Sequence, residues 1–151
     1  MYKPANCYKR SPEEKADKFL AWKRDDTAFF AAGACHILAF MFMELHYYEK
    51  RYTVIGLKAK QDSYVHHVYV TDGKWAFDYA GWTLEEELVR ETTKAHCEAT
   101  KEGDLEKIVI TEDLETFCKQ QNHRPPSYFP YLPWERAYNY IQRFDSEPPG
   151  N

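Results

Sequence analysis

Residues 67–78 read His-Val-Tyr-Val-Thr-Asp-Gly-Lys-Trp-Ala-Phe-Asp, and this stretch predicts a β-hairpin. Its β-branched and aromatic residues favour strands, and Asp72-Gly73 supplies the positive φ angles that a two-residue hairpin turn requires. Counting back from such a turn places His67 directly opposite Asp78. Opposite residues in a hairpin have Cβ atoms about 5 Å apart, so the imidazole and the carboxylate are expected to form a hydrogen bond.

Strand alternation separates His67 from its neighbour His66. Successive side chains point to opposite faces of a strand, so His67 shares a face with Asp78. His66 is expected on the other face, with Val68 and Val70. Only His67 therefore has a carboxylate partner in this arrangement.

Helical patterns flank the hairpin. Residues 34–46 carry apolar side chains at helical spacing, which predicts a helix with Cys35 in its first turn. Capping-box patterns at residues 11–14 and 83–86 predict two further helix starts. A single helix is expected to continue from the first start to Lys23, and the second helix is expected to run toward about Ala99. A last helix is expected over residues 134–144. Strands are expected over residues 51–57 and 105–110, which gives an α+β fold.

Length and composition fit one domain of 151 residues with its own core. Hydrophobic residues make up 44% of the chain and aromatic residues 17%, and a chain of about this length buries roughly 70% of its unfolded surface. The prolines of residues 124–134 predict an ordered aromatic loop, either a lid over the core or one wall of a groove. Residues 145–151 are expected to form a flexible tail.

Charge and hydropathy argue against two classes of partner. The net charge is −4, spread along the chain without a basic run, so nucleic acid is not expected as a partner. The longest apolar run, residues 28–43, is interrupted and too short to cross a bilayer, so no membrane span is expected. The oligomeric state stays open.

The four cysteines are Cys7, Cys35, Cys97 and Cys118, widely spaced and without a Cys-x-x-Cys pair. No signal peptide is recognised, so free thiols and a cytoplasmic location are expected. Cys35 is the candidate nucleophile, because the first turn of a helix favours a thiolate and offers free N–H groups to an oxyanion. With His67 as base and Asp78 orienting that base, the three residues have the logic of a catalytic triad.

Two segments carry a resemblance to a known superfamily. Gly33-Ala34-Cys35-His36-Ile37-Leu38-Ala39, together with residues 67–81, resembles the cysteine helix and His/Asp hairpin of papain-like and transglutaminase-like enzymes, most closely the compact bacterial and phage proteins. The resemblance spans about half of the chain. It implies a papain-like core in which the nucleophile helix packs on a small antiparallel sheet, with peripheral helices.

The resemblance also implies a function. Relatives hydrolyse peptide or isopeptide bonds, deamidate glutamine or transfer acyl groups through a thioester, on protein or peptide substrates and without a cofactor. Some act as delivered effectors, which is an alternative to the cytoplasmic location. Beside the catalytic Cys35, His67 and Asp78, the expected substrate-binding residues are Gly33, Ala34, His36 and Trp75.

Three alternatives remain open from the sequence. Papain-type enzymes place a glutamine before the nucleophile, and residues 25–30 contain none, so Asn6 or Gln61 would have to supply the missing donor. Without that donor, the fold could serve as a catalytically inactive binding or inhibitor module. His36 fits a helix-surface or packing position as well as a substrate contact.

A metal site is the third alternative. The possible ligands are Cys35, His36, His66, His67 and Asp78. His66 and His67 point to opposite faces, and no spacing repeats a known zinc pattern. We therefore expect no metal.

Overall fold

The computed structural model describes residues 1–150 and shows an α+β fold built on one antiparallel sheet. The sheet has the strand order β4-β3-β2-β1-β5. Its strands are β1 (Thr53–Ala59), β2 (His67–Thr71), β3 (Trp75–Asp78), β4 (Gly81–Leu84) and β5 (Leu105–Ile110). The α-helices are α1 (Pro12–Ala16), α2 (Lys18–Trp22), α3 (Asp26–Ala31), α4 (Cys35–Leu45), α5 (Glu85–Thr100), α6 (Leu114–Gln121) and α7 (Pro133–Ile141). Short 3-10 turns, η1 (Ala5–Tyr8) and η2 (Pro126–Tyr128), complete the elements.

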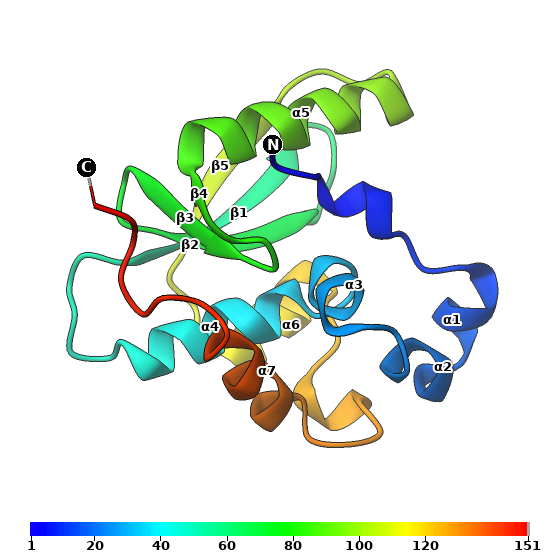
Figure 1. The fold of residues 1–151 in the computed structure, drawn as a ribbon. Coiled ribbons are helices and arrows are strands. Elements are labelled where there is room, and N and C mark those ends of the chain that lie inside the picture. The colour runs from blue at the N-terminus through cyan, green and yellow to red at the C-terminus, as the bar shows by residue number, and fades with distance from the viewer. Residues whose placement is uncertain (151) are drawn as a thin grey trace.

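The elements form three layers, with the sheet in the middle. Helix α5 crosses one face of the sheet, and α4 and α7 lie beneath the other (Figure 1). Helix α4 contacts β2 and β3, and its Phe42 ring lies 4.9 Å from the ring of Phe77. All five residues of β2 are buried. The expected packing of the Cys35 helix on a small antiparallel sheet is therefore observed.

The register of the β2–β3 hairpin differs from the sequence prediction. Thr71 pairs with Ala76 and Val70 with Phe77, so the connection is two residues longer than a two-residue turn. The Asp72 carboxylate accepts hydrogen bonds from the N–H groups of Lys74 and Trp75, which stabilises this wider turn. A register shift of two residues leaves every side chain on the face of the sheet that was predicted for it, because side chains alternate with a period of two.

The first helix prediction is correct at its start and wrong at its end. Ser11 and Glu14 form the expected capping box of α1. A single helix does not follow, however, because Asp17 adopts an extended conformation and its carboxylate caps a second helix, α2. Helix α3 was not predicted, and Asp25 caps it in the same way.

The predicted capping box at residues 83–86 is not formed. Thr83 lies in β4, where it pairs with Ala76, and the residue that precedes α5 is Leu84, which has no side-chain cap. Pairing between the neighbouring strands β3 and β4 overrides the capping pattern here. Glu85 is instead buried at the start of α5, where it accepts a hydrogen bond from the Tyr69 hydroxyl at 2.8 Å.

The C-terminal part packs against the α2–α3 region. Phe129 and Tyr131 contact Phe29 and Trp22, with ring centroids 5.7 and 5.6 Å apart, so the aromatic segment covers the core. Residues 145–150 contain no helix or strand, although the carbonyl of Asp145 accepts a hydrogen bond from the Trp82 indole.

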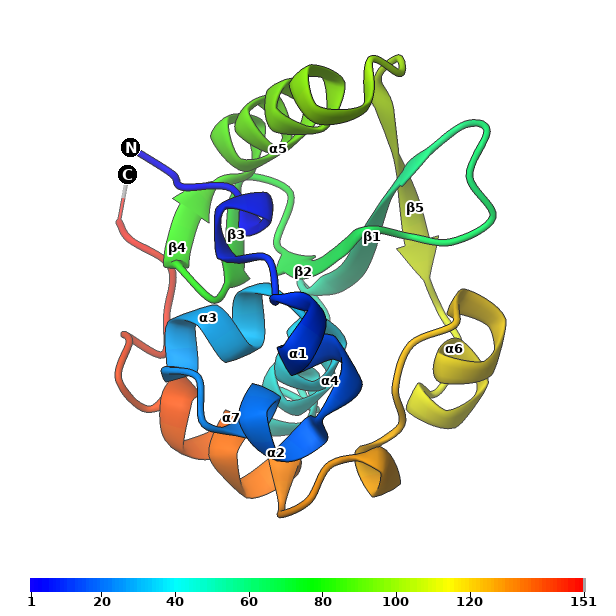
Figure 2. The same cartoon turned by 90° about the vertical axis from the view of Figure 1, so that its right-hand side faces the viewer.

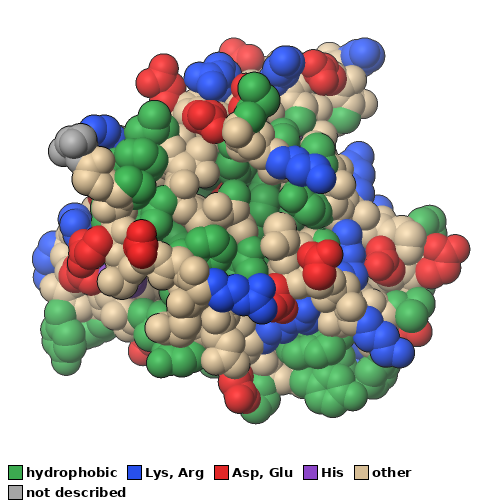
Figure 3. Space-filling view, viewed as in Figure 1, with side chains coloured by type: hydrophobic (Ala, Val, Ile, Leu, Met, Phe, Trp, Pro, Cys, Tyr) green, Lys and Arg blue, Asp and Glu red, His purple; other side chains and the backbone are tan. Residues whose placement is uncertain are grey.

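Two further properties concern the surface and the thiols. Basic and acidic side chains are interspersed over the face drawn in Figure 3. Among the described residues, no helix combines the length and the apolar character that crossing a membrane would need. All four cysteines are free thiols, as expected.

Candidate active site

Cys35 opens helix α4 after a backbone turn that depends on glycine. Gly33 has a φ of 113°, a conformation that L side chains rarely adopt, and Ala34 precedes the helix without a side-chain cap. The first N–H groups of a helix have no partner inside the helix. The thiol of Cys35 therefore lies beside uncapped N–H groups at the positive end of the α4 dipole.

His67 and Asp78 form the predicted contact. The Nε2 atom of His67 lies 2.9 Å from Oδ2 of Asp78, and both residues are almost fully buried. With the observed register the two residues are diagonal neighbours on one face of the sheet. Long side chains bridge such diagonal positions readily.

Asp78 has two further donors, which hold its carboxylate in place. The Tyr2 hydroxyl donates to Oδ2 at 2.7 Å, and the N–H of Ala80 donates to Oδ1 at 2.9 Å. Tyr2 comes from the N-terminus, 76 positions away in the chain. The carboxylate is thus fixed by strand, turn and N-terminal segment together.

Three imidazoles surround the thiol of Cys35, each with one nitrogen already bonded elsewhere. His36 Nε2 lies 2.7 Å from the carbonyl oxygen of Arg124, and His123 Nδ1 lies 2.8 Å from that of Gln121. His67 Nε2 contacts Asp78. The Nδ1 atoms of His36 and His67 are buried and have no hydrogen-bond partner among the described residues.

These imidazoles reverse the effect of burial on Cys35. Burial raises the pKa of the thiol, but its interactions with His123, His36 and His67 outweigh burial and hold the pKa well below its ordinary value. Burial lowers the pKa of His67, but Asp78 and the Cys35 sulfur outweigh this and raise it to about 10. The arrangement favours a thiolate beside an imidazolium.

A pocket of about 870 Å³ opens beside the thiol. Cys35 and His67 line it, and its walls come from the N-terminal segment, α5, the β1–β2 loop and the chain after α6. Figure 2 views the molecule from this side, with the N-terminal segment in blue, α5 above and α6 at the lower right. The size suits a ligand of several residues or a small molecule.

The expected substrate-binding residues lie in different places. Gly33 lines the pocket, whereas Ala34 and His36 are fully buried beside Cys35 and do not line it. Of the two positions expected for His36, the structure shows the packing position and not the helix surface, because its ring packs against Phe117 and His123. Trp75 lies at the start of β3, against a different pocket that Tyr2 and Tyr79 also line.

The structure adds His123, which the sequence analysis did not single out. It follows α6 and reaches Cys35 because Asn122 adopts a left-handed conformation, with a φ of 54°, and turns the chain back. Interaction with Cys35 offsets the effect of burial and raises the pKa of His123. No local pattern marks a single histidine 88 positions after a cysteine, so the sequence held no usable signal.

Neither Asn6 nor Gln61, the two candidate oxyanion donors, has a free amide at the pocket. Asn6 lines the pocket, but its amide donates to the carbonyl of Ala95 at 3.3 Å. Gln61 is exposed in the β1–β2 loop and does not line the pocket. The uncapped N–H groups of α4 are therefore the donors closest to the thiol along the chain.

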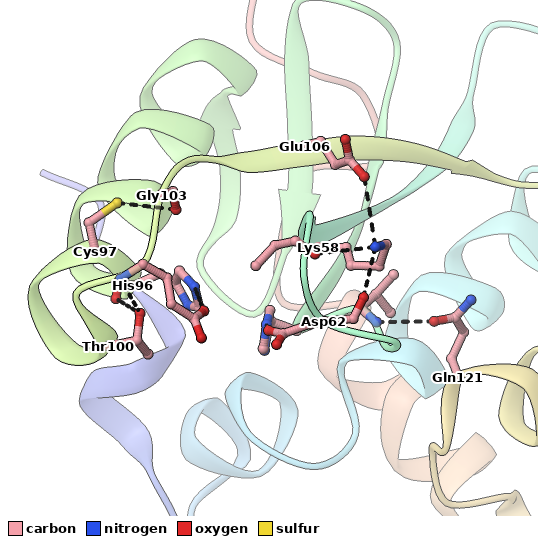
Figure 4. Close-up of polar contacts among 12 residues, drawn as sticks. Lys58, Asp62, His96, Cys97, Thr100, Gly103, Glu106 and Gln121 are labelled. Atoms are coloured by element: carbon pink, nitrogen blue, oxygen red, sulfur yellow. Dashed lines mark hydrogen bonds and ion pairs between the residues drawn. The ribbon is translucent and has the colours of Figure 1, made fainter.

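Within residues 1–150, two groups of side chains could hold a metal ion. One consists of Cys35, His36 and His123, and the other of Asp62, His66 and His96; within each, the ligand atoms lie within 4.8 Å of one another. The second group lies on the pocket rim, where the β1–β2 loop that carries Asp62 faces the end of α5 that carries His96 (Figure 4). His66 thus contacts Asp62 rather than Asp78.

Comparison with known proteins does not place this chain in a family. No family model, curated protein or solved structure matches it. The arguments for function therefore come from the geometry of the site.

Proposed function

We propose that this protein is a cysteine-dependent hydrolase or acyl transferase with a papain-like arrangement of Cys35, His67 and Asp78. Its substrate is an amide: a peptide bond, an isopeptide bond or a glutamine side chain. One observation carries the proposal, namely that a thiol at an uncapped helix start lines a large pocket beside an imidazole held by a buried carboxylate.

The reaction follows from the charges of these groups. The Cys35 thiolate attacks the carbonyl carbon, and a bond forms between sulfur and carbon while the negative charge moves to the oxygen. The N–H groups at the start of α4 stabilise that oxyanion. The imidazolium of His67 donates its proton to the nitrogen that leaves, and the acyl group remains on Cys35 as a thioester.

Water or an amine completes the cycle. His67, now neutral, takes a proton from the incoming nucleophile, which attacks the thioester carbon and releases the thiolate. Asp78 holds the His67 ring through Nε2, so that the other nitrogen is left for the proton transfers. Water gives hydrolysis or deamidation, and an amine gives acyl transfer.

A panel of peptides with glutamine side chains and backbone amides tests this function. Mass spectrometry separates the products, because scission, deamidation and amine incorporation give different masses. We expect an acyl adduct on Cys35 and no turnover by Cys35→Ala, while the matched variant Cys118→Ala keeps its activity. Turnover by Cys35→Ala equal to the wild type contradicts the proposal. A folded protein whose Cys35 is inert supports the alternative of an inactive binding or inhibitor module.

A second candidate function is metal binding at Cys35, His36 and His123. The observation that favours it is that His36 and His123 each contact a backbone carbonyl through the nitrogen remote from the cluster, as metal-ligating histidines commonly do. Cobalt(II) titration distinguishes this function, because a thiolate ligand gives a sulfur-to-metal charge-transfer band. Loss of that band in Cys35→Ser and in His123→Gln supports a metal centre, and its absence in the wild type excludes one.

A further inference from the structure

The pocket beside Cys35 is lined by cationic residues in a protein whose net charge is −4. These residues are Lys9, Arg10 and Arg124. Among the described lining residues none is an aspartate or a glutamate. Three fixed positive charges without a carboxylate in the lining favour ligands that carry a negative charge.

Arg10 lines the pocket and lies against the turn that precedes the nucleophile. A Cβ atom built on Gly33 would lie 3.4 Å from Cζ and 3.5 Å from Nη1 of Arg10. The guanidinium therefore rests on the bare backbone of Gly33, two residues before Cys35. A Cβ atom at position 33 would make an ordinary van der Waals contact with this guanidinium, so it is the positive φ that restricts this position to glycine.

Arg10 has no partner of its own in the described part of the chain. Its Nη1 atom is buried without a hydrogen bond, and the residue takes part in no ion pair. Burial and the neighbouring Arg124 guanidinium lower the pKa of Arg10. Arg10 is partly buried, and a buried N–H donor without a hydrogen-bond acceptor is costly, so a ligand oxygen that accepts from Nη1 would stabilise it.

Glu14, the carboxylate whose charge acts on Arg10, is engaged elsewhere. Glu14 accepts a hydrogen bond from the N–H of Ser11 as part of the α1 cap, and it pairs with Arg24 at 3.5 Å. Arg24 in turn donates to the carbonyl of Tyr8. Arg124 differs from Arg10, because its guanidinium lies over the Tyr128 ring at 4.5 Å and contacts the carbonyl of Lys15. Arg10 alone of these three arginines is free to meet a ligand.

We infer that Arg10 binds a carboxylate of the substrate, so that the protein acts on amides that carry a carboxylate close to the reacting bond. A guanidinium presents paired N–H donors that match a carboxylate in a bidentate contact. This inference rests on the proposed function, since it places the carboxylate relative to the Cys35 thiol. The carboxylate comes from an acidic side chain or from a peptide C-terminus.

Two alkylating agents that differ in charge test the inference. Iodoacetate carries a carboxylate beside its reacting carbon, and iodoacetamide is its neutral counterpart. We expect the rate ratio of iodoacetate to iodoacetamide to be about tenfold higher at Cys35 than at the exposed Cys7 of the same chain, as one charge-assisted contact would give. Arg10→Gln should bring the ratio at Cys35 down by most of this factor.

The matched control is Arg90→Gln, because Arg90 is exposed on α5 and does not line the pocket. It should leave the ratio unchanged. A Cys35 that reacts with neither agent overturns the proposed function. A Cys35 that reacts with iodoacetamide, but whose ratio is ordinary or is unaffected by Arg10→Gln, overturns the inference and leaves the proposed function standing.

A competition experiment identifies the anion. Succinate and inorganic phosphate are each tested for protection of Cys35 against iodoacetamide, in the wild type and in Arg10→Gln. Protection by succinate that is lost in the variant supports the carboxylate, and protection by phosphate alone overturns it. Glutamine peptides with either an adjacent glutamate or a free C-terminus then distinguish the two sources of the carboxylate.

Discussion

Cys35 and Cys118 are two buried thiols of one protein with opposite electrostatic surroundings. They are 7% and 4% exposed, respectively. The Cys118 sulfhydryl donates a hydrogen bond to the carbonyl of Arg124 at 3.7 Å. His36, which follows Cys35 in the chain, contacts the same carbonyl through Nε2. Burial raises the pKa of Cys118 to about 11, whereas the pKa of Cys35 lies well below its ordinary value.

The difference between the two thiols teaches that burial does not decide reactivity. Burial acts on both thiols in the same direction, against the charged form. Only Cys35 has imidazoles around it, and only Cys35 starts a helix. Charge partners supplied by distant parts of the chain therefore convert an inert buried thiol into a candidate nucleophile.

The largest expected effect is on alkylation at about pH 6, well below the ordinary thiol pKa of about 8.5. Cys35 should react with iodoacetamide at least about 100-fold faster than Cys118, because the thiolate is the reacting form. Peptide mapping by mass spectrometry over a time course measures both rates in one sample. Faster labelling of Cys118 than of Cys35 in the folded protein would contradict the conclusion that the surroundings of Cys35 favour its thiolate.

The next effect concerns the base. His67→Gln should raise the pKa of Cys35 and slow its alkylation at about pH 6 by about 100-fold, because the charge partner beside the thiol is lost. His66→Gln is the matched control, since His66 is exposed and contacts Asp62, and it should change the rate by less than about twofold. If His66→Gln abolishes the alkylation of Cys35 at this pH and His67→Gln does not, the assignment of His67 as the base is wrong.

A smaller effect is expected from His123, the imidazole that sequence analysis missed. His123→Gln should slow the low-pH alkylation of Cys35 by about tenfold, because one of three favourable imidazole interactions is removed. The pH–rate profile of alkylation gives the shifted pKa directly. If His123→Gln slows the alkylation of Cys35 more than His67→Gln does, the result favours a metal site at Cys35, His36 and His123 over the catalytic triad.

The smallest effect is on stability and depends on pH. The folded pKa of His67 is raised to about 10, so its protonation stabilises the fold fully below its unfolded pKa of about 6.5 and less as the pH rises toward 10. Asp78→Asn removes the carboxylate that contributes to this shift. We expect the variant to lose about 1–2 kcal/mol of unfolding free energy near pH 6, as for one charged hydrogen bond.

Urea denaturation at a series of pH values measures this loss. The difference between wild type and Asp78→Asn should shrink between pH values of about 6.5 and 10. Tyr2→Phe serves as the control, because it removes the other side-chain donor to Asp78 without changing a charge at these pH values. A difference that grows with pH would show that His67 is neutral in the folded protein.

Sequence patterns predicted the Cys35 helix and the hairpin that carries His67 and Asp78. Both depend on local signals: apolar side chains at helical spacing, and β-branched and aromatic residues around Asp72-Gly73. The hydrogen bond between His67 and Asp78 was predicted although the register was not. The faces were correct because the error was two residues, one full period of strand alternation.

Other elements were missed because two local patterns compete for the same backbone. Thr83 has the local environment of a helix cap, yet it belongs to β4 because Ala76 pairs with it. Asp17 divides an expected single helix because its carboxylate caps a new one. In these places the backbone can form either of two hydrogen-bonding patterns, and a single sequence does not reveal which of them forms.

The sequence by itself determined the chemistry that is possible here: a cysteine at a helix start, and a histidine and a carboxylate on the same face of a hairpin. Only the tertiary structure decided what surrounds that thiol. It brings His123 from behind α6, Tyr2 from the N-terminus and Arg10 against Gly33. The physical reason is that electrostatic interactions act through space over a few ångströms, while the residues that supply them are separated by tens of positions along the chain.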